Sequence, residues 1–185
     1  MTAENRNEVL FASARPERVD RGLTLPARFD RLLERLNVSG AVKGKTVAVK
    51  MHVGGGLGYS TIHPLFVRLL VEHIRKGGPK RVFVTDGSVR DAARRGYTEE
   101  TVGAPLASSI GDNGKDVKPR RTRWPHMKTV YLGKPILDAD VLVNFSHVKG
   151  HGDCGFGGAC KNLAMGCVPD RTRQAVTILR DLGTP

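Results

Sequence analysis

The chain has 185 residues, of which 30 are Lys or Arg and 18 are Asp or Glu, so its formal net charge is +12. Hydrophobic residues make up 39% and aromatic residues 5%, which indicates one domain of ordinary size with an aliphatic core. No apolar run is long enough to cross a bilayer and no basic-then-apolar leader follows Met1, so we expect a soluble cytoplasmic protein rather than a membrane or secreted one.

Two parts are expected along the chain. Residues 1–25 are polar, Arg-rich and aperiodic, and predict a loosely attached N-terminal segment. Residues 26–185 predict a single α/β domain. Its first helix opens at Pro26, because Phe29 and the leucines that follow it lie on one helical face.

Strands and helices alternate in the first half of this domain. The β-rich runs at 46–53 and 81–86 predict strands, and each run ends beside glycine. Between them, an apolar stripe predicts a helix with Pro64 in its first turn. The stretch 89–110 predicts a helix interrupted by glycine and proline. The expected cap of the helix at Pro64 is Ser60 or Thr61.

The second half adds further strands. Residues 111–128 predict a polar, basic connection, and strands follow at 130–132 and 139–146. The continuous apolar run 141–143 is typical of a buried parallel strand. A short helix around 161–165 and a weakly helical C-terminus complete the pattern. The alternation predicts an α/β fold with a mostly parallel sheet flanked by helices, in a Rossmann-like three-layer arrangement.

Three loops are expected to meet at one edge of this sheet. They follow Val53, Asp86 and Ser146, each near the carboxyl end of a predicted strand. Ligands of such sheets bind beyond these strand ends, so we predict a pocket there. The first loop, 54–58, lacks the last glycine of a dinucleotide fingerprint, and we do not assign it a nucleotide.

The third loop carries the densest set of reactive groups. His147, Lys149 and His151 alternate, so an extended strand would direct all three to one face. The favoured interpretation makes these side chains ligands of a small anion, with His147 or His151 as general acid or base. In the alternative, His52, His147 and His151 bind a divalent metal while Asp86 or Asp153 orients an imidazole. The candidate catalytic residues are therefore His147, Lys149, His151 and Asp86.

The turn around Gly157 and Gly158 predicts an anion site. Its glycines let backbone N–H groups approach an anion, the following helix adds positive potential, and Lys161 adds a full charge. We predict Asn162 as a further contact. Lys50 is costly to bury unpaired, so it either lines the same cleft or extends its ammonium to solvent. The alternative is a tight turn that needs glycine only for positive φ.

The three cysteines predict no cofactor by themselves. Their odd number and their Cys-x5-Cys-x6-Cys spacing fit neither a disulfide framework nor a zinc ribbon. We expect buried thiols beside the glycine-rich turn. The positions are Cys154, Cys160 and Cys167.

The positive charge keeps a second class of partner open. A polyanion or nucleic acid would find its densest basic patch at 118–124. That patch contains one aromatic residue, whereas single-strand binders interleave several. A small anionic ligand is therefore the favoured partner, and nucleic acid is the alternative.

The motif from Ser146 to His151, followed by the one from Gly155 to Cys167, resembles the iron–sulfur-centre proteins of domain-of-unknown-function family 362. In that family a Ser-His-x-Lys-Gly-His motif precedes a Gly-Phe-Gly-Gly-Ala-x-Lys-Asn-Leu-Gly-Met-Gly-Cys motif, where this chain has Ala164 for one glycine. The resemblance implies a redox-linked enzyme or its substrate-binding half, which holds a small anionic ligand.

The resemblance also implies a 4Fe–4S cluster. Longer members of the family continue into a ferredoxin-like module with a Cys-x2-Cys-x2-Cys-x3-Cys-Pro run, and this chain contains no such run. We therefore expect either the N-terminal part of a longer architecture or a variant without the module, with an iron–sulfur module or partner supplying the cluster.

Overall fold

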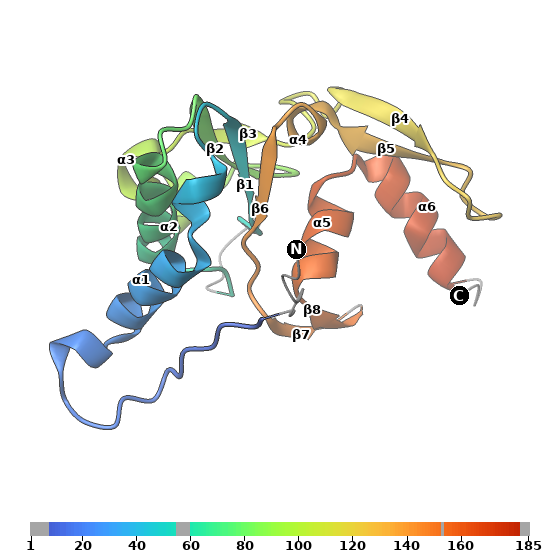
Figure 1. Cartoon of the computed structure of the whole chain (residues 1–185). Helices are drawn as coiled ribbons and strands as arrows, with labels where there is room; N and C mark the ends of the chain where they lie inside the picture. The colour runs from blue at the N-terminus through green and yellow to red at the C-terminus, as the bar shows by residue number, and fades with distance from the viewer. Residues whose placement is uncertain (1–7, 55–59, 153, 182–185) are drawn as a thin grey trace, which may run out of the picture.

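The structure is a computed structural model in which residues 8–54, 60–152 and 154–181 are described. Asp153 and most of the glycine-rich run predicted after Val53 lie outside these residues. The strands of the central sheet are β1 (Thr46–Lys50), β2 (Arg81–Asp86), β3 (Leu106–Ser108) and β6 (Val141–Asn144). All neighbours are parallel, and the order is β3-β2-β1-β6 (Figure 1).

Helices cover both faces of this sheet. They are α1 (Leu25–Leu36), α2 (Pro64–Lys76), α3 (Glu99–Val102), α5 (Ala159–Gly166) and α6 (Asp170–Asp181). Figure 1 shows α1, α2 and α3 on one side of the sheet and α5 and α6 on the other. The predicted Rossmann-like three-layer α/β fold is thereby confirmed. Within the described ranges, none of the helices has the length and apolar character that a membrane span requires.

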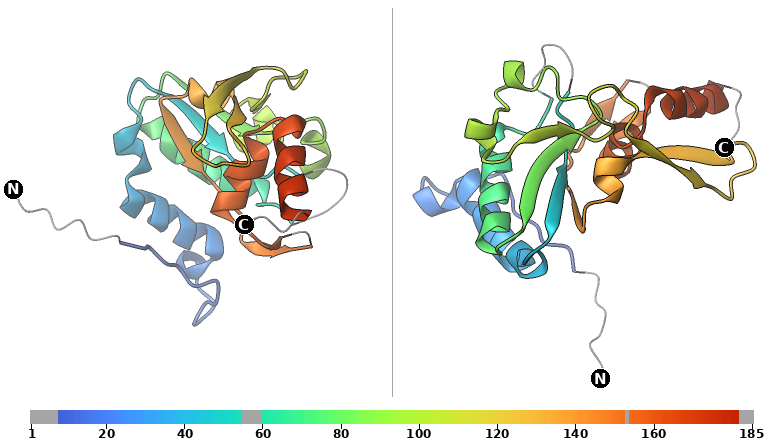
Figure 2. Two further views of the ribbon diagram at one scale, coloured as in Figure 1. Left: turned by 90° about the vertical axis from the view of Figure 1, so that its right-hand side faces the viewer. Right: turned by 90° about the horizontal axis from the view of Figure 1, so that it is seen from above.

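Two antiparallel strand pairs complete the fold. They are β4 (Val117–Arg121) with β5 (Thr129–Gly133), and β7 (Lys149–His151) with β8 (Gly155–Gly157); the short helix α4 (Lys134–Leu137) follows β5. Seen from above, the β4–β5 ribbon extends away from the central sheet (Figure 2, right). Tyr131 anchors it on α6, because the Arg171 guanidinium carbon lies 3.4 Å from the ring centroid and the Tyr131 N–H donates to the Thr172 hydroxyl.

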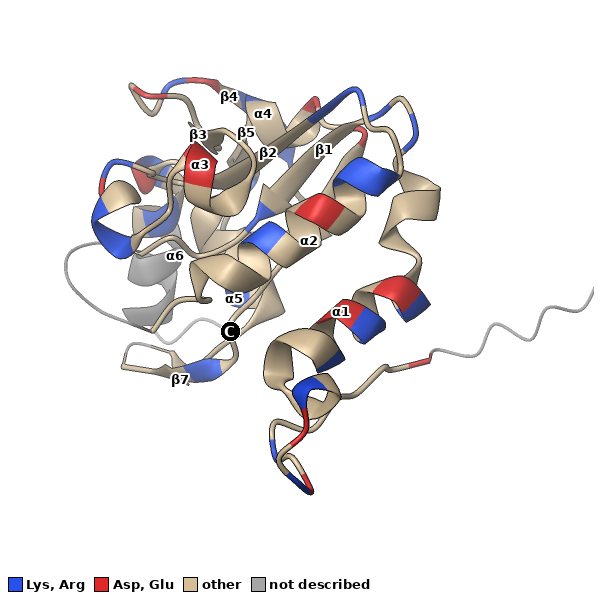
Figure 3. Cartoon of the chain, turned by 90° about the vertical axis from the view of Figure 1, so that its left-hand side faces the viewer, with Lys and Arg blue, Asp and Glu red and all other residues tan. Residues whose placement is uncertain are grey.

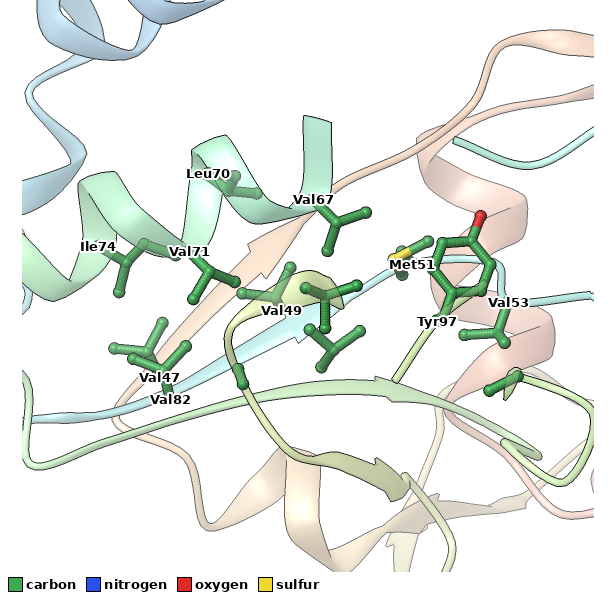
Figure 4. Close-up of a cluster of buried hydrophobic side chains, with 14 of the residues drawn as sticks. Val47, Val49, Met51, Val53, Val67, Leu70, Val71, Ile74, Val82 and Tyr97 are labelled. Carbon is green, nitrogen blue, oxygen red and sulfur yellow. The ribbon is translucent and has the colours of Figure 1, made fainter. Parts of the chain in front are cut away.

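An apolar core fills the space between β1 and α2 (Figure 4). Side chains alternate along a strand, so Val47 and Val49 point towards α2 while Lys50 points to the opposite face. Val71 and Ile74 of α2 pack against the two valines, and all four side chains are fully buried. Burial of one such aliphatic side chain stabilises the fold by about 1.5–3 kcal/mol.

The start of α2 differs from the prediction. Pro64 is the first residue of the helix, where its fixed φ is already helical and its missing N–H costs no hydrogen bond. The residue before it, His63, therefore becomes the cap, and its Nδ1 accepts the Leu65 N–H at 3.2 Å. The prediction of Ser60 or Thr61 as the cap is wrong.

The interrupted helix predicted for residues 89–110 is also wrong in large part. Gly96 and Gly103 adopt φ values of 80° and 78°, which end a 3-10 turn and the single-turn helix α3. The chain then forms β3, parallel to β2. Similarly, β4 lies inside the predicted connection 111–128. Its Lys, Pro and Arg side chains have low strand propensity, and pairing with β5 supplies the missing stability.

The central strands are shorter than predicted. β1 ends at Lys50, before the end of the predicted run 46–53, and β6 covers only four residues of the run 139–146. β6 lies at the end of the sheet, and its Leu142 is 40% exposed. The prediction that β6 is a parallel strand is therefore correct. The prediction that it is buried is wrong, because an edge strand has a neighbouring strand on one side only.

The N-terminal segment follows the outer side of α1. Residues 8–20 form neither helix nor strand, and Phe11 is 84% exposed. The Arg28 guanidinium of α1 donates to the Ser13 carbonyl at 2.7 Å. The described contacts of the N-terminal segment are thus made largely with polar groups of α1.

Candidate functional site

A pocket of about 270 Å³ lies at the carboxyl edge of β1 and β2. From β1 the chain passes to β2 on one flank and later to β6 on the other flank, so β1 and β6 border the switch point at which α/β sheets bind ligands. The pocket lining contains every residue that the sequence predicts as catalytic, cofactor-binding or metal-ligating. It also contains residues that were not predicted, among them Ser88, Asp91, Met165, Gly166 and Arg173.

A buried ion pair forms the floor of the pocket. The Lys50 ammonium at the end of β1 lies 3.0 Å from Asp86 Oδ1 at the end of β2. It also donates to Asn162 Oδ1 at 2.6 Å and to the Met51 carbonyl at 3.0 Å. The Lys50 side chain is 1% exposed, so it lines the pocket and does not extend to solvent. Full pairing is what makes burial of this charge tolerable.

Asp86 is the most heavily bonded carboxylate of the site. It accepts the N–H groups of Val53 at 2.9 Å and Gly87 at 2.8 Å, and His52 Nδ1 lies 3.4 Å from its Oδ2. Burial raises the pKa of Asp86, but the His52 contact, the Lys50 charge and the two backbone donors outweigh burial and lower that pKa to about 2. Asp86 is therefore an anion at neutral pH, and Lys50 and His52 lie beside it.

Asn162 of α5 connects the two strands that border the switch point. Its amide nitrogen donates to the Lys50 carbonyl on β1 at 3.0 Å and to Asn144 Oδ1 on β6 at 2.7 Å. It also lies 3.0 Å from the Ser146 hydroxyl. Asn162 was predicted as a contact of the site, whereas Asn144 and Ser146 were not. The available signal was a pair of polar residues at the end of an otherwise apolar strand.

Gly166 allows α5 to approach this network. A Cβ at this position would lie 2.2 Å from Lys50 Nζ and 2.5 Å from Asp86 Oδ1. Any side chain would therefore occupy the space of the ion pair. This requirement cannot be recognised from the sequence, since a glycine at the end of a helix is equally typical of a C-terminal cap.

The reactive groups after β6 do not lie on one continuous strand. β6 ends at Asn144, and Lys149 and His151 belong to the separate hairpin β7–β8. The expected single strand through His147 and these two residues is thus wrong, because the hairpin has its own register with Gly157 opposite Lys149. The three side chains nevertheless line the same pocket.

The two histidines of this segment differ in their contacts. His151 Nε2 lies 2.5 Å from Lys161 Nζ. An ammonium can only donate, so this nitrogen of His151 acts as the acceptor. His147 Nδ1 is buried and has no hydrogen-bond partner among the described residues. His147 therefore has a ring nitrogen that no described residue occupies.

The Lys149 and Lys161 side chains both lie beside Gly157. A Cβ on Gly157 would lie 3.6 Å from Lys149 Cγ and 3.9 Å from Lys161 Cδ. Lys149 Nζ donates to the main-chain carbonyl of Ser60. Burial lowers the pKa of Lys149, and the positive charges of Lys161 and Arg95 lower it further. Cationic side chains thus dominate this wall of the pocket.

Metal-ligating side chains are not grouped in the described part of the chain. No cluster of three or more His, Cys, Asp or Glu there is arranged to hold an ion. Cys154 and Cys160 are exposed and Cys167 is buried, so the expectation of buried thiols is correct for Cys167 only. Burial raises the pKa of the Cys167 thiol, which disfavours the thiolate that a metal would need. The described cysteines do not fit an iron–sulfur cluster.

One comparison with known proteins gives a match. The sequence model of a family described as Domain of unknown function (DUF362) matches residues 47–180, which include all of the sheet except Thr46, the pocket and most of α6. No curated protein and no solved structure matches the chain.

Proposed function

Because the chain belongs to the DUF362 family, whose description names no reaction, we propose a function from the pocket itself. The protein is an enzyme, or the substrate-binding half of one, that holds a small anionic substrate at the carboxyl edge of the sheet. His147 transfers a proton to or from that substrate. The observation that carries the proposal is the meeting of cationic side chains, three imidazoles and a helix N-terminus in one pocket.

Charge supports an anionic substrate. Lys149 and Lys161 line the pocket in addition to Lys50, whose charge is balanced by Asp86, and to Arg173, whose Nη1 lies 3.2 Å from Asp170 Oδ1. Gly158 caps α5 without a side-chain hydrogen bond, so the first N–H groups of that helix are not occupied by a capping side chain. Such N–H groups bind carboxylates and phosphates, and Lys161 on the same turn adds a full charge.

Proton transfer by His147 follows from the contacts of the two imidazoles. His151 is held against Lys161, which suits a role in orienting that lysine. His147 lines the pocket with an Nδ1 that has no partner among residues 8–54, 60–152 and 154–181, and a neutral imidazole nitrogen is a suitable general base near neutral pH.

The anion site is tested by binding of inorganic phosphate and of oxalate, measured by titration calorimetry. Lys161→Ala should weaken binding at least about tenfold, since it removes a charge-assisted contact of about 1.5–3 kcal/mol. His151→Ala should weaken binding by a smaller factor because it releases Lys161. Lys43→Ala, an exposed lysine outside both the pocket and the β4–β5 ribbon, is the matched control. Wild-type affinity in Lys161→Ala, with unchanged far-UV circular dichroism, would remove the site from this pocket.

The resemblance to iron–sulfur-centre proteins extends the proposal to a redox-linked reaction. In that case the 4Fe–4S cluster belongs to a separate module or partner, because the cysteines described here do not fit it. Co-purification with a cluster-bearing partner, read from the visible absorbance of the complex, tests this extension. A divalent metal held by His52, His147 and His151 stays a prediction, and elemental analysis of protein purified without chelator tests it.

A second candidate function is polyanion binding by the β4–β5 ribbon. Figure 3 shows basic and acidic residues interleaved along α1 and α2, whereas residues 117–137 contain no Asp or Glu. Arg120, Arg121, Arg123 and Lys128 are exposed there and form no ion pair with a described residue. Segregated positive charge on a projecting ribbon favours a polyphosphate backbone as partner.

Salt dependence tests this second function. Binding of single-stranded RNA or DNA should weaken steeply between 50 and 200 mM salt, because each neutralised phosphate releases a counterion. Arg121→Ala should reduce that slope by roughly one phosphate contact. A flat salt titration would dismiss polyanion binding without affecting the pocket.

A further inference from the structure

The turn that joins β4 to β5 is held together by hydrogen bonds within it. The Thr122 N–H donates to the Lys128 carbonyl at 2.9 Å, and the Thr122 hydroxyl donates to the Met127 carbonyl. The Trp124 N–H donates to the same hydroxyl at 3.2 Å, and the Trp124 carbonyl accepts the Met127 N–H at 3.3 Å. The backbone of Trp124 is therefore held on both sides, at the end of the ribbon.

The two large apolar side chains of this turn differ in their exposure. Met127 is 7% exposed, whereas Trp124 is 38% exposed. Met127 is thus the apolar side chain that the turn buries. The Trp124 indole keeps part of its surface in water, where it contributes less to folding than a buried ring and is accessible to another molecule.

Positive charge surrounds this indole along the ribbon. Four exposed cationic side chains lie within four residues of Trp124 in the sequence, namely Arg120, Arg121, Arg123 and Lys128. The ribbon extends away from the central sheet, so a linear polyanion can lie along it (Figure 2, right). Cationic side chains that follow a phosphate backbone, together with an aromatic ring that takes a base, are the combination with which proteins bind single strands.

We propose that Trp124 stacks on one unpaired base, so that the partner of the β4–β5 ribbon is single-stranded nucleic acid. This proposal rests on the polyanion binding proposed above and specifies the class of polyanion. The exposed arginines and Lys128 contact phosphates, and the indole contacts the base. A duplex has its bases stacked on one another and polyphosphate has none, so neither can make the indole contact.

The single aromatic ring determines what each part of the ribbon contributes. Charge supplies most of the affinity and all of its salt dependence, because only the cationic side chains displace counterions. Stacking adds one base contact, which is tolerant of sequence because every base has an aromatic face. Removal of the indole should therefore lower the affinity at every salt concentration and leave the salt slope unchanged.

Intrinsic fluorescence tests the stacking contact, because Trp124 is the only tryptophan in the chain. The full chain is titrated with a thymidine oligonucleotide of about 12 nucleotides, with a duplex of the same length and with inorganic polyphosphate. The single strand should quench most of the Trp124 emission. The duplex and polyphosphate should bind with little quenching.

Variants separate stacking from charge, with affinity measured by anisotropy of a labelled oligonucleotide. Trp124→Ala should weaken single-strand binding about fivefold or more, while its salt slope and its affinity for polyphosphate stay at the wild-type values. Trp124→Phe keeps an aromatic face and should retain most of the affinity. Phe11→Ala removes another exposed aromatic side chain, outside the ribbon, and should leave binding unchanged.

The outcomes distinguish this inference from polyanion binding itself. Wild-type affinity for the single strand in Trp124→Ala, or equal quenching by the duplex or by polyphosphate, overturns the stacking proposal and leaves polyanion binding by the ribbon standing. Absence of salt-dependent binding to any of these polyanions overturns the function of the ribbon. Quenching by the single strand alone, with affinity lost in Trp124→Ala and retained in Trp124→Phe, supports both.

Discussion

The two faces of β1 differ in character: one face packs into an apolar core, and the other face contributes to a polar network. Val47 and Val49 face α2 and belong to the buried apolar cluster between β1 and α2 (Figure 4). Lys50, the next residue, faces α5 and is held by Asp86 and Asn162. One face is stabilised by non-directional burial, while the other depends on particular donors and acceptors at particular distances.

This difference predicts which face of the sheet tolerates amino-acid substitution and which does not. A core position accepts another aliphatic side chain of similar volume at a cost below about 1.5 kcal/mol. The polar network has no such equivalents, because removing one partner leaves a buried charge unpaired. A substitution on the core face should therefore change stability alone, and one on the network face should change stability and ligand binding together.

The largest effect is expected for Asp86→Leu. It leaves the Lys50 ammonium buried and unpaired, and it removes the acceptor of the Val53 and Gly87 N–H groups. Breaking a buried ion pair costs about 3–5 kcal/mol, so the free energy of unfolding in urea should fall by that amount. Anion binding in the pocket should be lost as well.

The double variant Lys50→Met/Asp86→Leu is the control. It removes both charges, so the penalty of the unpaired ammonium disappears while the two orphaned N–H groups remain. Its stability should lie between those of the wild type and of Asp86→Leu. A double variant no more stable than the single one would show that the ion pair is not the source of the cost.

A somewhat smaller effect, confined to stability, is expected for Ile74→Ala. Ile74 is fully buried against the valines of β1, and truncation of such a side chain costs about 2–5 kcal/mol through lost burial and the cavity left behind. Oxalate affinity measured at a temperature where the variant is folded should equal that of the wild type. Ile74→Val, at about 1 kcal/mol, is the matched control.

The elements of the core face could be predicted from the sequence more accurately than the contacts of the network face. The core follows from period-two and helical apolar spacing, so 81–86 was predicted with its observed bounds. Elements held by partners distant in sequence were missed. β4 has little strand propensity of its own and depends on β5, and β3 depends on β2. Local propensity does not report such pairing.

The same distinction holds inside the site. Residues with reactive side chains were predicted from their types, and the parallel sheet rule was enough to bring Lys50, Asp86 and His147 to one edge. Gly166 was missed because its role is to leave space for side chains from two other strands. The His151–Lys161 contact was missed because the separate β7–β8 hairpin sets it. Contacts that depend on three-dimensional packing carry no signature in spacing.

The smallest of the three expected effects is a difference between the two faces of β1 in how the free energy of unfolding depends on pH. The pKa of Asp86 is lowered from 3.8 to about 2 in the folded protein, so on acidification the unfolded chain takes up this proton first. The associated stability, about 2 kcal/mol, is present above pH ~4 and is lost as the pH falls towards the folded pKa. The free energy of unfolding, measured in urea between pH 6 and pH 2, should therefore decline more steeply for the wild type than for Asp86→Asn. Ile74→Val removes no titrating group and should decline in parallel with the wild type, at a lower value throughout. Equal slopes for the wild type and Asp86→Asn would mean that the network does not hold Asp86 as an anion.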